Sequence, residues 1–156
     1  MAETGYVLGE ELICLVHQAA ARLAVAMAPV LRSHDLALPS WRILALLCAS
    51  GAMRVGYLAS RLSLEVSTVS RNVAQLERRG LIMRQRASVG RRATDLVLTA
   101  EGSALVAALA PALATIQQPL LCELTATEQS TLKRLLRQIP KVLNDQALQG
   151  EPEYSD

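Results

Sequence analysis

The apolar residues of the chain fall into stripes that predict a mainly helical protein. Between residues 66 and 76 the apolar positions are spaced three, four and three residues apart, which places them on one face of a helix. This stripe consists of Val66, Val69, Val73 and Leu76. Two longer stripes of leucine and isoleucine follow toward the C-terminus. Their members are Leu105, Leu109, Leu113, Ile116 and Leu120, and then Leu132, Leu135, Leu136, Ile139 and Leu143.

Glycine, proline and capping residues separate these stripes and give the expected order α-α-α-α-β-β-α-α. We expect helices over residues 10–33, 41–49, 55–62, 65–79, 100–121 and 125–143, and strands over residues 81–87 and 94–98. Gly80 ends the fourth helix, and Thr125 with Glu128 forms a capping box before the last helix. Pro29 is expected to kink the first helix or to stop it a few residues early.

The length and composition indicate one domain over residues 1–145. The chain has 156 residues, of which 51% are hydrophobic, so it can bury a sizeable core. Residues 144–156 carry four acids and no basic residue, and we expect this tail to be disordered. No unbroken apolar run reaches the roughly 18 residues that span a bilayer, and the N-terminus lacks the pattern of a signal peptide. We therefore expect a cytoplasmic protein without a membrane segment.

Positive charge is concentrated in the middle of the chain. The net charge is only +2, yet residues 55–98 contain eight arginines, three acids and no lysine. Such a basic segment in a nearly neutral protein is typical of a partner that is a polyanion, although a solvated surface is the simpler alternative. Arginine also matches the geometry of phosphate and guanine better than lysine does.

The polar face of the fourth predicted helix has the composition of a DNA-reading surface. It carries short hydrogen-bonding side chains and one arginine, and neither Lys nor Glu occurs between residues 66 and 76. Short donors and acceptors near a helix N-terminus suit entry into a major groove. The candidate DNA-binding residues of this helix are Ser67, Thr68, Ser70, Arg71, Asn72 and Gln75. An ordinary amphipathic helix with a polar outer face is the alternative.

The two strands after this helix predict a wing. The third and fourth helices form a helix-turn-helix, and the hairpin that follows carries Arg86, Arg91 and Arg92 near its tip. Arginine at such a tip can reach a narrow minor groove, where the negative potential is strongest.

Residues 58–102 resemble the winged helix-turn-helix of the multiple antibiotic resistance regulator (MarR) family. The segment STVSRNVAQLERRGLI is similar to the recognition helix of the family, and LPSWRILALL to its second helix. The segment GRRATDLVLTAEG is similar to the wing signature, except that Gly90 stands where the family has an acid that braces the wing. The resemblance implies that Arg92 is the minor-groove arginine, with Arg91 as the alternative or as a phosphate contact.

The resemblance also implies a homodimer and an effector pocket. In the family, the N-terminal helix and the last two helices form the dimer, and these correspond to residues 10–33 and 100–143; the DNA-binding unit corresponds to residues 39–98. The leucine stripes agree, because they need more helix to be buried, although a bundle within one chain is the alternative. The implied effector is an aromatic carboxylate or a phenol. The candidate ligand-binding residues are His17, Arg22, His34, Trp41 and Arg42, for which packing in the core is the alternative.

The three cysteines do not form a metal or disulfide motif. Cys14, Cys48 and Cys122 are widely spaced and surrounded by apolar residues, so we expect buried thiols. The chain also lacks an HExxH motif and a glycine-rich phosphate loop, and we expect neither a metal, a cofactor nor an enzyme activity.

The sequence therefore predicts a dimeric, ligand-responsive, winged helix-turn-helix repressor that binds a palindromic operator in double-stranded DNA. A thiol-based redox sensor on the same scaffold is one alternative. A winged-helix module that binds protein is another.

Overall fold

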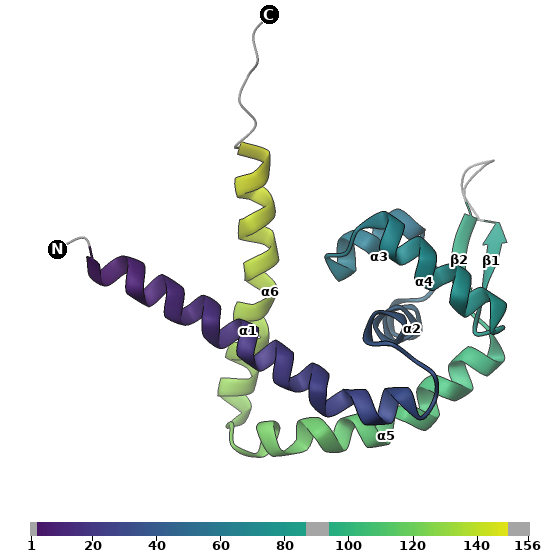
Figure 1. Ribbon diagram of the computed structural model, residues 1–156, viewed down its shortest axis with the longest axis horizontal. Helices are drawn as coiled ribbons and strands as arrows, with labels where there is room; N and C mark the ends of the chain where they lie inside the picture. Colours follow the sequence, from purple (N-terminus) through teal and green to yellow (C-terminus); the bar gives the residue numbers. More distant parts are fainter. Residues whose placement is uncertain (1–2, 87–93, 150–156) are drawn as a thin grey trace, which may run out of the picture. The chain divides into compact units, whose positions relative to one another are not determined.

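The computed structural model describes residues 3–86 and 94–149, which form six helices and one two-stranded sheet (Figure 1). The elements are α1 (Glu3–Arg32), α2 (Leu38–Ser50), α3 (Val55–Leu62), α4 (Val66–Arg78), β1 (Ile82–Arg86), β2 (Thr94–Leu98), α5 (Ala100–Cys122) and α6 (Ala126–Gln149). This order confirms the expected mainly α winged-helix fold. The chain divides into two units, Met1–Ile116 and Gln117–Asp156, and α5 runs through the boundary.

The core of the first unit lies where α2, α3, α4 and the sheet meet. Ile43, Leu44, Leu58, Val69 and Val73 are completely shielded from solvent. The predicted stripe on α4 is therefore confirmed at Val69 and Val73, and also at Leu76, which is 1% exposed. Val66 is an exception, because it is the first residue of α4 and remains 53% exposed. Burial of this stripe fixes which face of α4 is left outside.

Two helices extend further than the sequence predicted. The first helix begins at Glu3 instead of residue 10, and its end at Arg32 agrees with the predicted end at residue 33. Pro29 does not stop it early, because the Pro29 carbonyl still accepts a bond from the Ser33 N–H at 3.1 Å and Leu31 is anchored in the core. The last helix does not end near residue 143 but runs through Pro140 to Gln149. The expectation of a disordered segment from residue 144 is therefore wrong for residues 144–149, and residues 150–156 lie outside the described part.

The wing strands pair with each other and with the segment before α3. β1 and β2 are antiparallel, with Ile82 opposite Leu98 and Arg86 opposite Thr94. Met53 forms an isolated bridge with Leu96, through N–H···O bonds of 3.1 and 2.8 Å. This bridge attaches the N-terminal end of α3 to the wing.

The start of α5 packs closely against the exit from α4. The Thr99 hydroxyl donates a hydrogen bond to the Gly80 carbonyl at 2.6 Å and accepts one from the Gly102 N–H at 3.0 Å. A Cβ atom at residue 102 would overlap the carbonyl oxygen of Leu81. The Thr-x-x-Gly sequence that closes the wing segment therefore allows the start of α5 to approach the backbone of Gly80 and Leu81.

The two C-terminal leucine stripes have different environments. Leu109 and Leu113 on α5 are buried within the first unit, and Leu105 and Ile116 are partly buried against its core. The α6 stripe is exposed: Leu132, Leu135, Leu136 and Ile139 are between 38% and 48% accessible. The side chains of Leu120 and Leu143 lie outside the described part. Leu109 and Leu113 are therefore buried without a second chain, whereas dimer contacts of the other residues of the α5 stripe stay a prediction.

Two helical stretches are long and apolar enough to cross a membrane by length and composition alone. They are Glu11–Arg32 and Ala100–Pro119. The expectation from unbroken apolar runs missed them, since they contain isolated polar residues. Such stretches also occur in core and interface helices, and the second one contributes Leu109 and Leu113 to the core.

Candidate nucleic-acid interface

The helix-turn-helix is closed by a tight turn between α3 and α4. Ser63 adopts a left-handed conformation with φ of 52°, and its N–H and that of Leu64 bond back to the last turn of α3. The apolar face of α4 then packs against α2 and α3. As a result, Ser67, Ser70, Arg71 and Gln75 are exposed on the outer side of α4. Four of the six predicted DNA-reading residues are thus presented together.

Thr68 and Asn72 are placed differently from these four. Both are half-buried, and the Asn72 amide is engaged within the protein. The hydroxyl of Ser40 on α2 donates to Asn72 Oδ1 at 2.8 Å, and Asn72 Nδ2 donates to the Thr68 carbonyl at 2.9 Å. Ser40 is a buried polar residue with 4% exposure, so its hydroxyl needs this partner. Asn72 thus joins α4 to α2, a position that its helical spacing alone did not reveal.

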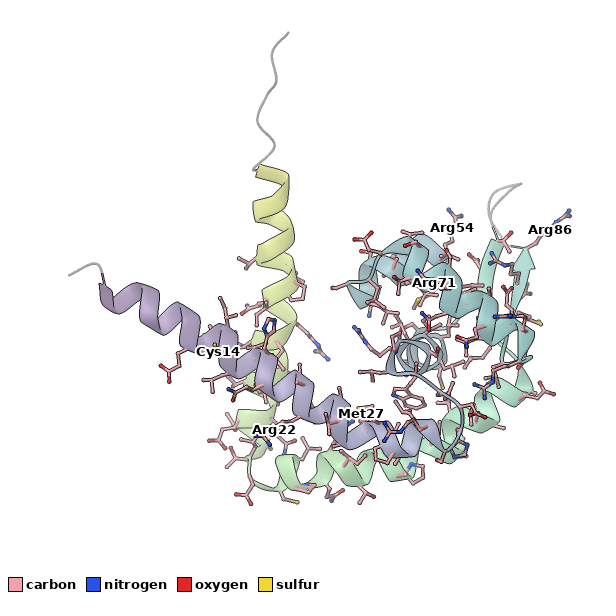
Figure 2. The ribbon with its side chains drawn as sticks, viewed as in Figure 1. Cys14, Arg22, Met27, Arg54, Arg71 and Arg86 are labelled. Atoms are coloured by element: carbon pink, nitrogen blue, oxygen red, sulfur yellow. The ribbon has the colours of Figure 1, made fainter. Side chains whose placement is uncertain are left out.

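Three exposed arginines surround the outer face of α4. Arg54 precedes α3, Arg71 lies on α4 and Arg86 ends β1. Figure 2 shows Arg54 and Arg86 on the side of the first unit toward which the wing strands extend, and Arg71 on α4. Arginines at a helix N-terminus, on a recognition helix and on a wing are suitably placed to contact successive phosphates.

Arg54 was missed by sequence reasoning. Its Nε lies 3.8 Å from Asp95 Oδ1, and 60% of its side chain is exposed, so this ion pair leaves most of the guanidinium accessible. The signal that could have identified it is its place immediately before α3. Its proximity to the wing arises from the bridge between Met53 and Leu96, which no local pattern predicts.

Arg84 differs from its neighbours on the wing. Its Nε lies 2.9 Å from Glu77 Oε1, which ties β1 to the last turn of α4. Arg84 therefore has a structural partner, whereas Arg86 is exposed at the end of β1 (Figure 2). The predicted wing-tip residues Gly90, Arg91 and Arg92 lie outside the described part of the chain.

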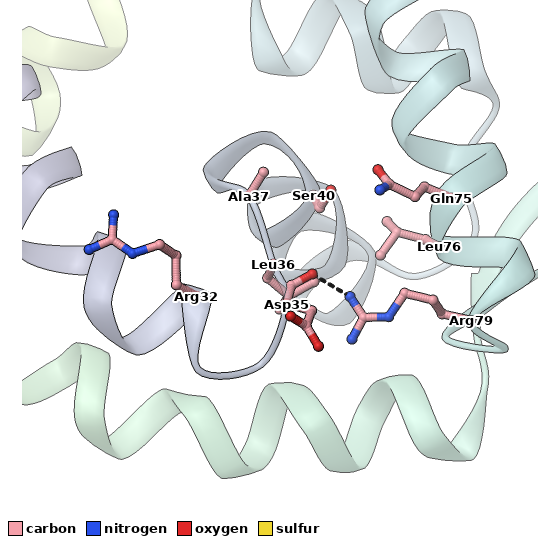
Figure 3. Close-up of a pocket in the computed structure, with 8 residues that line it drawn as sticks. All are labelled: Arg32, Asp35, Leu36, Ala37, Ser40, Gln75, Leu76 and Arg79. Carbon is pink, nitrogen blue, oxygen red and sulfur yellow. Dashed lines mark hydrogen bonds between the residues drawn. The ribbon is translucent and has the colours of Figure 1, made fainter.

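A cavity of about 480 Å³ opens between the end of α1, the start of α2 and the C-terminal half of α4 (Figure 3). Its polar lining includes Arg32, Ser40, Gln75 and Arg79. Arg79 donates from Nη1 to the Asp35 carbonyl at 2.6 Å and from Nη2 to the His34 carbonyl at 2.8 Å. The remaining lining residues are Asp35, Leu36, Ala37 and Leu76.

The five predicted ligand-binding residues do not gather in this or any other described cavity. His17 and Arg22 are exposed on α1, where Arg22 borders a shallow hollow formed by that helix alone. His34 contributes its carbonyl to Arg79, and Trp41 is half-buried against the core. Arg42 donates to the Leu62 carbonyl at 2.7 Å and so joins α2 to α3. None of the five lines the cavity beside Arg79.

The expectation of buried cysteines is wrong. Cys14, Cys48 and Cys122 are all exposed. Cys48 follows the buried Leu47 on α2 and lies about 100° around the helix from it, outside the buried face, and Cys122 is the last residue of α5. Within residues 3–86 and 94–149, no cluster of three or more His, Cys, Asp or Glu side chains could hold a metal ion.

The fold and the sequence can be compared with known proteins. The MarR family model matches residues 36–94. NadR in complex with 4-hydroxyphenylacetate is 23% identical, covers 86% of this chain and 98% of its own, and has a TM-score of 0.73. PcaV from Streptomyces coelicolor, in complex with its natural ligand, is 26% identical, covers 81% of this chain and 89% of its own, and has a TM-score of 0.68. A cysteine-to-serine mutant of MarR from E. coli, complexed with operator DNA, is 22% identical, covers 83% of this chain and 93% of its own, and has a TM-score of 0.70. No curated protein sequence gives a significant match.

The family match covers the helix-turn-helix and the first residue of β2, and these are the elements that present the exposed face of α4. The fold of the chain beyond the matched segment is also shared with solved MarR-family structures. The segment 36–94 of the chain therefore resembles the MarR family, and the chain shares the fold of solved MarR-family structures.

Proposed function

We propose that the protein is a repressor that binds a palindromic DNA operator through α4 and the wing. The observation that carries this proposal is the exposed face of α4, with Ser67, Ser70, Arg71 and Gln75 directed away from the buried stripe. Arg71 and the flanking Arg54 and Arg86 supply phosphate contacts, and the short side chains of α4 read base edges. Arg91 and Arg92 extend these contacts into the minor groove.

The repressor acts as a homodimer in this proposal. Support comes from the first unit, in which α1 leaves Leu12, Ile13 and Val25 between 60% and 73% exposed, and from the exposed leucine stripe of α6. Apolar surface of this extent is characteristic of an interface. Two-fold symmetry would place the two α4 helices on half-sites about 34 Å apart, which is one turn of DNA. A cytoplasmic location follows from the same function.

The effector is an aromatic acid or a phenol that binds in the cavity beside Arg79. The cavity supplies guanidinium groups from α1 and α4, together with the amide of Gln75, and its volume suits a single-ring acid. The solved NadR structure contains 4-hydroxyphenylacetate, an acid of this chemical class. Binding in this cavity would affect the recognition helix directly, because Gln75, Leu76 and Arg79 belong to it or cap it.

Selection from a random pool of DNA duplexes tests the operator function. We expect the purified protein to enrich a palindrome and to bind it as two chains per site, with an affinity that falls steeply as salt rises. Enrichment of no sequence, or binding of one chain per site, would contradict the proposal. Titration of the bound complex with 4-hydroxyphenylacetate and related acids then tests release.

A thiol-based redox sensor is a second candidate, because all three cysteines are exposed. Accessible thiols are open to oxidation. Under this alternative, peroxide releases the operator and a Cys→Ser variant no longer responds, whereas aromatic acids have no effect. Under the main proposal, the triple Cys→Ser variant still responds to the acid.

A further inference from the structure

The turn that follows α1 has two carbonyl groups that α1 itself does not satisfy. The Leu36 N–H bonds to the Leu31 carbonyl at 2.9 Å and the Asp35 N–H to the Arg32 carbonyl at 3.0 Å. This pattern is a Schellman motif, with Asp35 in the left-handed position at φ of 51°. Aspartate is tolerated in this conformation better than most residues. The carbonyls of His34 and Asp35 lie in the turn, and Arg79 provides their hydrogen-bond donors.

Arg79 reaches this turn from the C-terminal cap of α4, 44 residues further along the chain. One planar guanidinium bonds both carbonyls, at 2.6 and 2.8 Å (Figure 3 draws the bond to Asp35). The neighbouring Arg78 carries the same charge, but its Nε donates to the Ala74 carbonyl within α4 at 3.3 Å. The two adjacent arginines thus make different contacts, and of this pair only Arg79 connects the end of α4 to the turn after α1.

A second contact fixes the same side of α4. Asn72 receives the hydroxyl of Ser40, and Asn72 precedes Arg79 by seven positions. Residues seven apart lie within about 20° of each other around a helix and about 10 Å apart along it. The helix is therefore held at two points on one face, which defines the direction of its axis and not only its position.

We propose that Arg79 is a positioning residue that sets the angle of the recognition helix by holding it to the end of α1. Loss of its two bonds removes the tie between the end of α4 and the end of α1. Asn72, the buried stripe and the Arg84–Glu77 pair still hold the helix in place, so the expected change is in its angle and not in its fold. Sequence-specific contacts need this angle, whereas non-specific contacts with phosphates tolerate a change in it. The inference rests on the DNA-binding function proposed above.

The test compares Arg79→Ala with the matched control Arg78→Ala, since each variant loses one positive charge at adjacent positions. We expect Arg79→Ala to bind the selected operator about tenfold more weakly than Arg78→Ala, the effect of losing a charged hydrogen bond. Binding to an unrelated duplex should be equal in the two variants. The salt dependence of operator binding should also be equal, because Arg79 contacts no phosphate in this proposal. Arg79→Lys keeps the charge but not the planar fork, so it should restore binding only in part.

Hydrogen exchange of the free protein provides a readout that does not involve DNA. We expect the amides of residues 33–36 to exchange faster in Arg79→Ala than in Arg78→Ala, and Arg79→Lys to be intermediate. Equal exchange in the two alanine variants, equal operator affinity, or full rescue by lysine would each overturn the positioning role. If the wild-type protein selects no operator while exchange still differs, the contact is real and the proposed function is the part that fails.

Discussion

Ser40 and Asn72 are joined by a hydrogen bond of 2.8 Å that connects the buried side of α2 to the middle of the recognition helix. Asn72 also donates to the Thr68 carbonyl at 2.9 Å, so its amide oxygen and nitrogen both have partners within the protein. This arrangement indicates that Asn72 holds α4, and its predicted role in reading bases stays a prediction.

Substitutions at Asn72 and Ser70 should therefore have different effects. We expect Asn72→Ala to lower the free energy of unfolding by about 1–3 kcal/mol, because it leaves the Ser40 hydroxyl buried without this partner. Its binding to all DNA sequences should fall in parallel. Ser70→Ala should leave stability unchanged and alter which operator variants are preferred. Urea unfolding and a panel of operator variants measure both effects, and a change in operator preference caused by Asn72→Ala alone would contradict the assignment.

The wing arginines offer a second comparison, between Arg86 and Arg84. Arg86→Ala should weaken operator binding and reduce the slope of log affinity against log salt by about 0.9, the value for one phosphate contact. Arg84 is bound to Glu77 at 2.9 Å, so Arg84→Ala should reduce the slope less. Fluorescence anisotropy at several salt concentrations measures the slopes. The same measurement on Arg92→Ala tests the predicted wing-tip contact, and an unchanged affinity there removes Arg92 from the interface.

Alanine substitutions at two glycines should change the stability of the protein in opposite directions. Gly102→Ala should destabilise the protein by about 1–3 kcal/mol, the usual cost of forcing extra volume into a packed site, because a Cβ would overlap the Leu81 carbonyl. Gly56 lies in α3 and a Cβ there meets nothing within 4 Å. Gly56→Ala should therefore stabilise the protein by about 0.4–1 kcal/mol through reduced entropy of the unfolded chain. Thermal and urea unfolding of both variants decide the matter, and equal effects would show that the close approach of α5 is not needed.

The capping box of α6 predicts a dependence on pH. The Thr125 hydroxyl and N–H donate to Glu128 Oε2 at 2.7 and 2.8 Å, and these bonds hold the pKa of Glu128 below its ordinary value of 4.5. A carboxylate with a lowered pKa in the folded state contributes stability that is present above pH 4.5 and is lost as pH falls through the lowered pKa.

Carboxyl NMR titration tests this coupling at the site itself. The pKa of Glu128 should be low in the wild-type protein and should return toward its ordinary value in Thr125→Ala. The glutamine in the Glu128→Gln variant has no titratable proton. The variant should therefore be less stable than the wild-type protein at neutral pH, and this difference in stability should disappear in acid, where Glu128 of the wild type is protonated. A difference that persists well below the titration of Glu128 would mean that the carboxylate charge does not stabilise the start of α6.

Much of the fold could be predicted because it depends on residues close together in sequence. The spacing of Val69, Val73 and Leu76 identified the buried face of α4, since helical periodicity relates neighbours three and four apart. Thr125 and Glu128 identified the start of α6 for the same reason. A local signal was overridden where tertiary packing competed with it, as when α1 continued past Pro29 to the buried Leu31 instead of stopping early.

By itself, the sequence determined the order of the elements, the recognition helix and the basic character of the surface around it. Only the tertiary structure decided which polar residues on that helix face outward, which arginines are held by partners, and where the cavity lies. The contact of Asn72 spans 32 positions, and those of Arg79 span 44 and 45. The physical reason is that a local pattern fixes the faces of a helix, whereas the partner of each face depends on how distant segments pack.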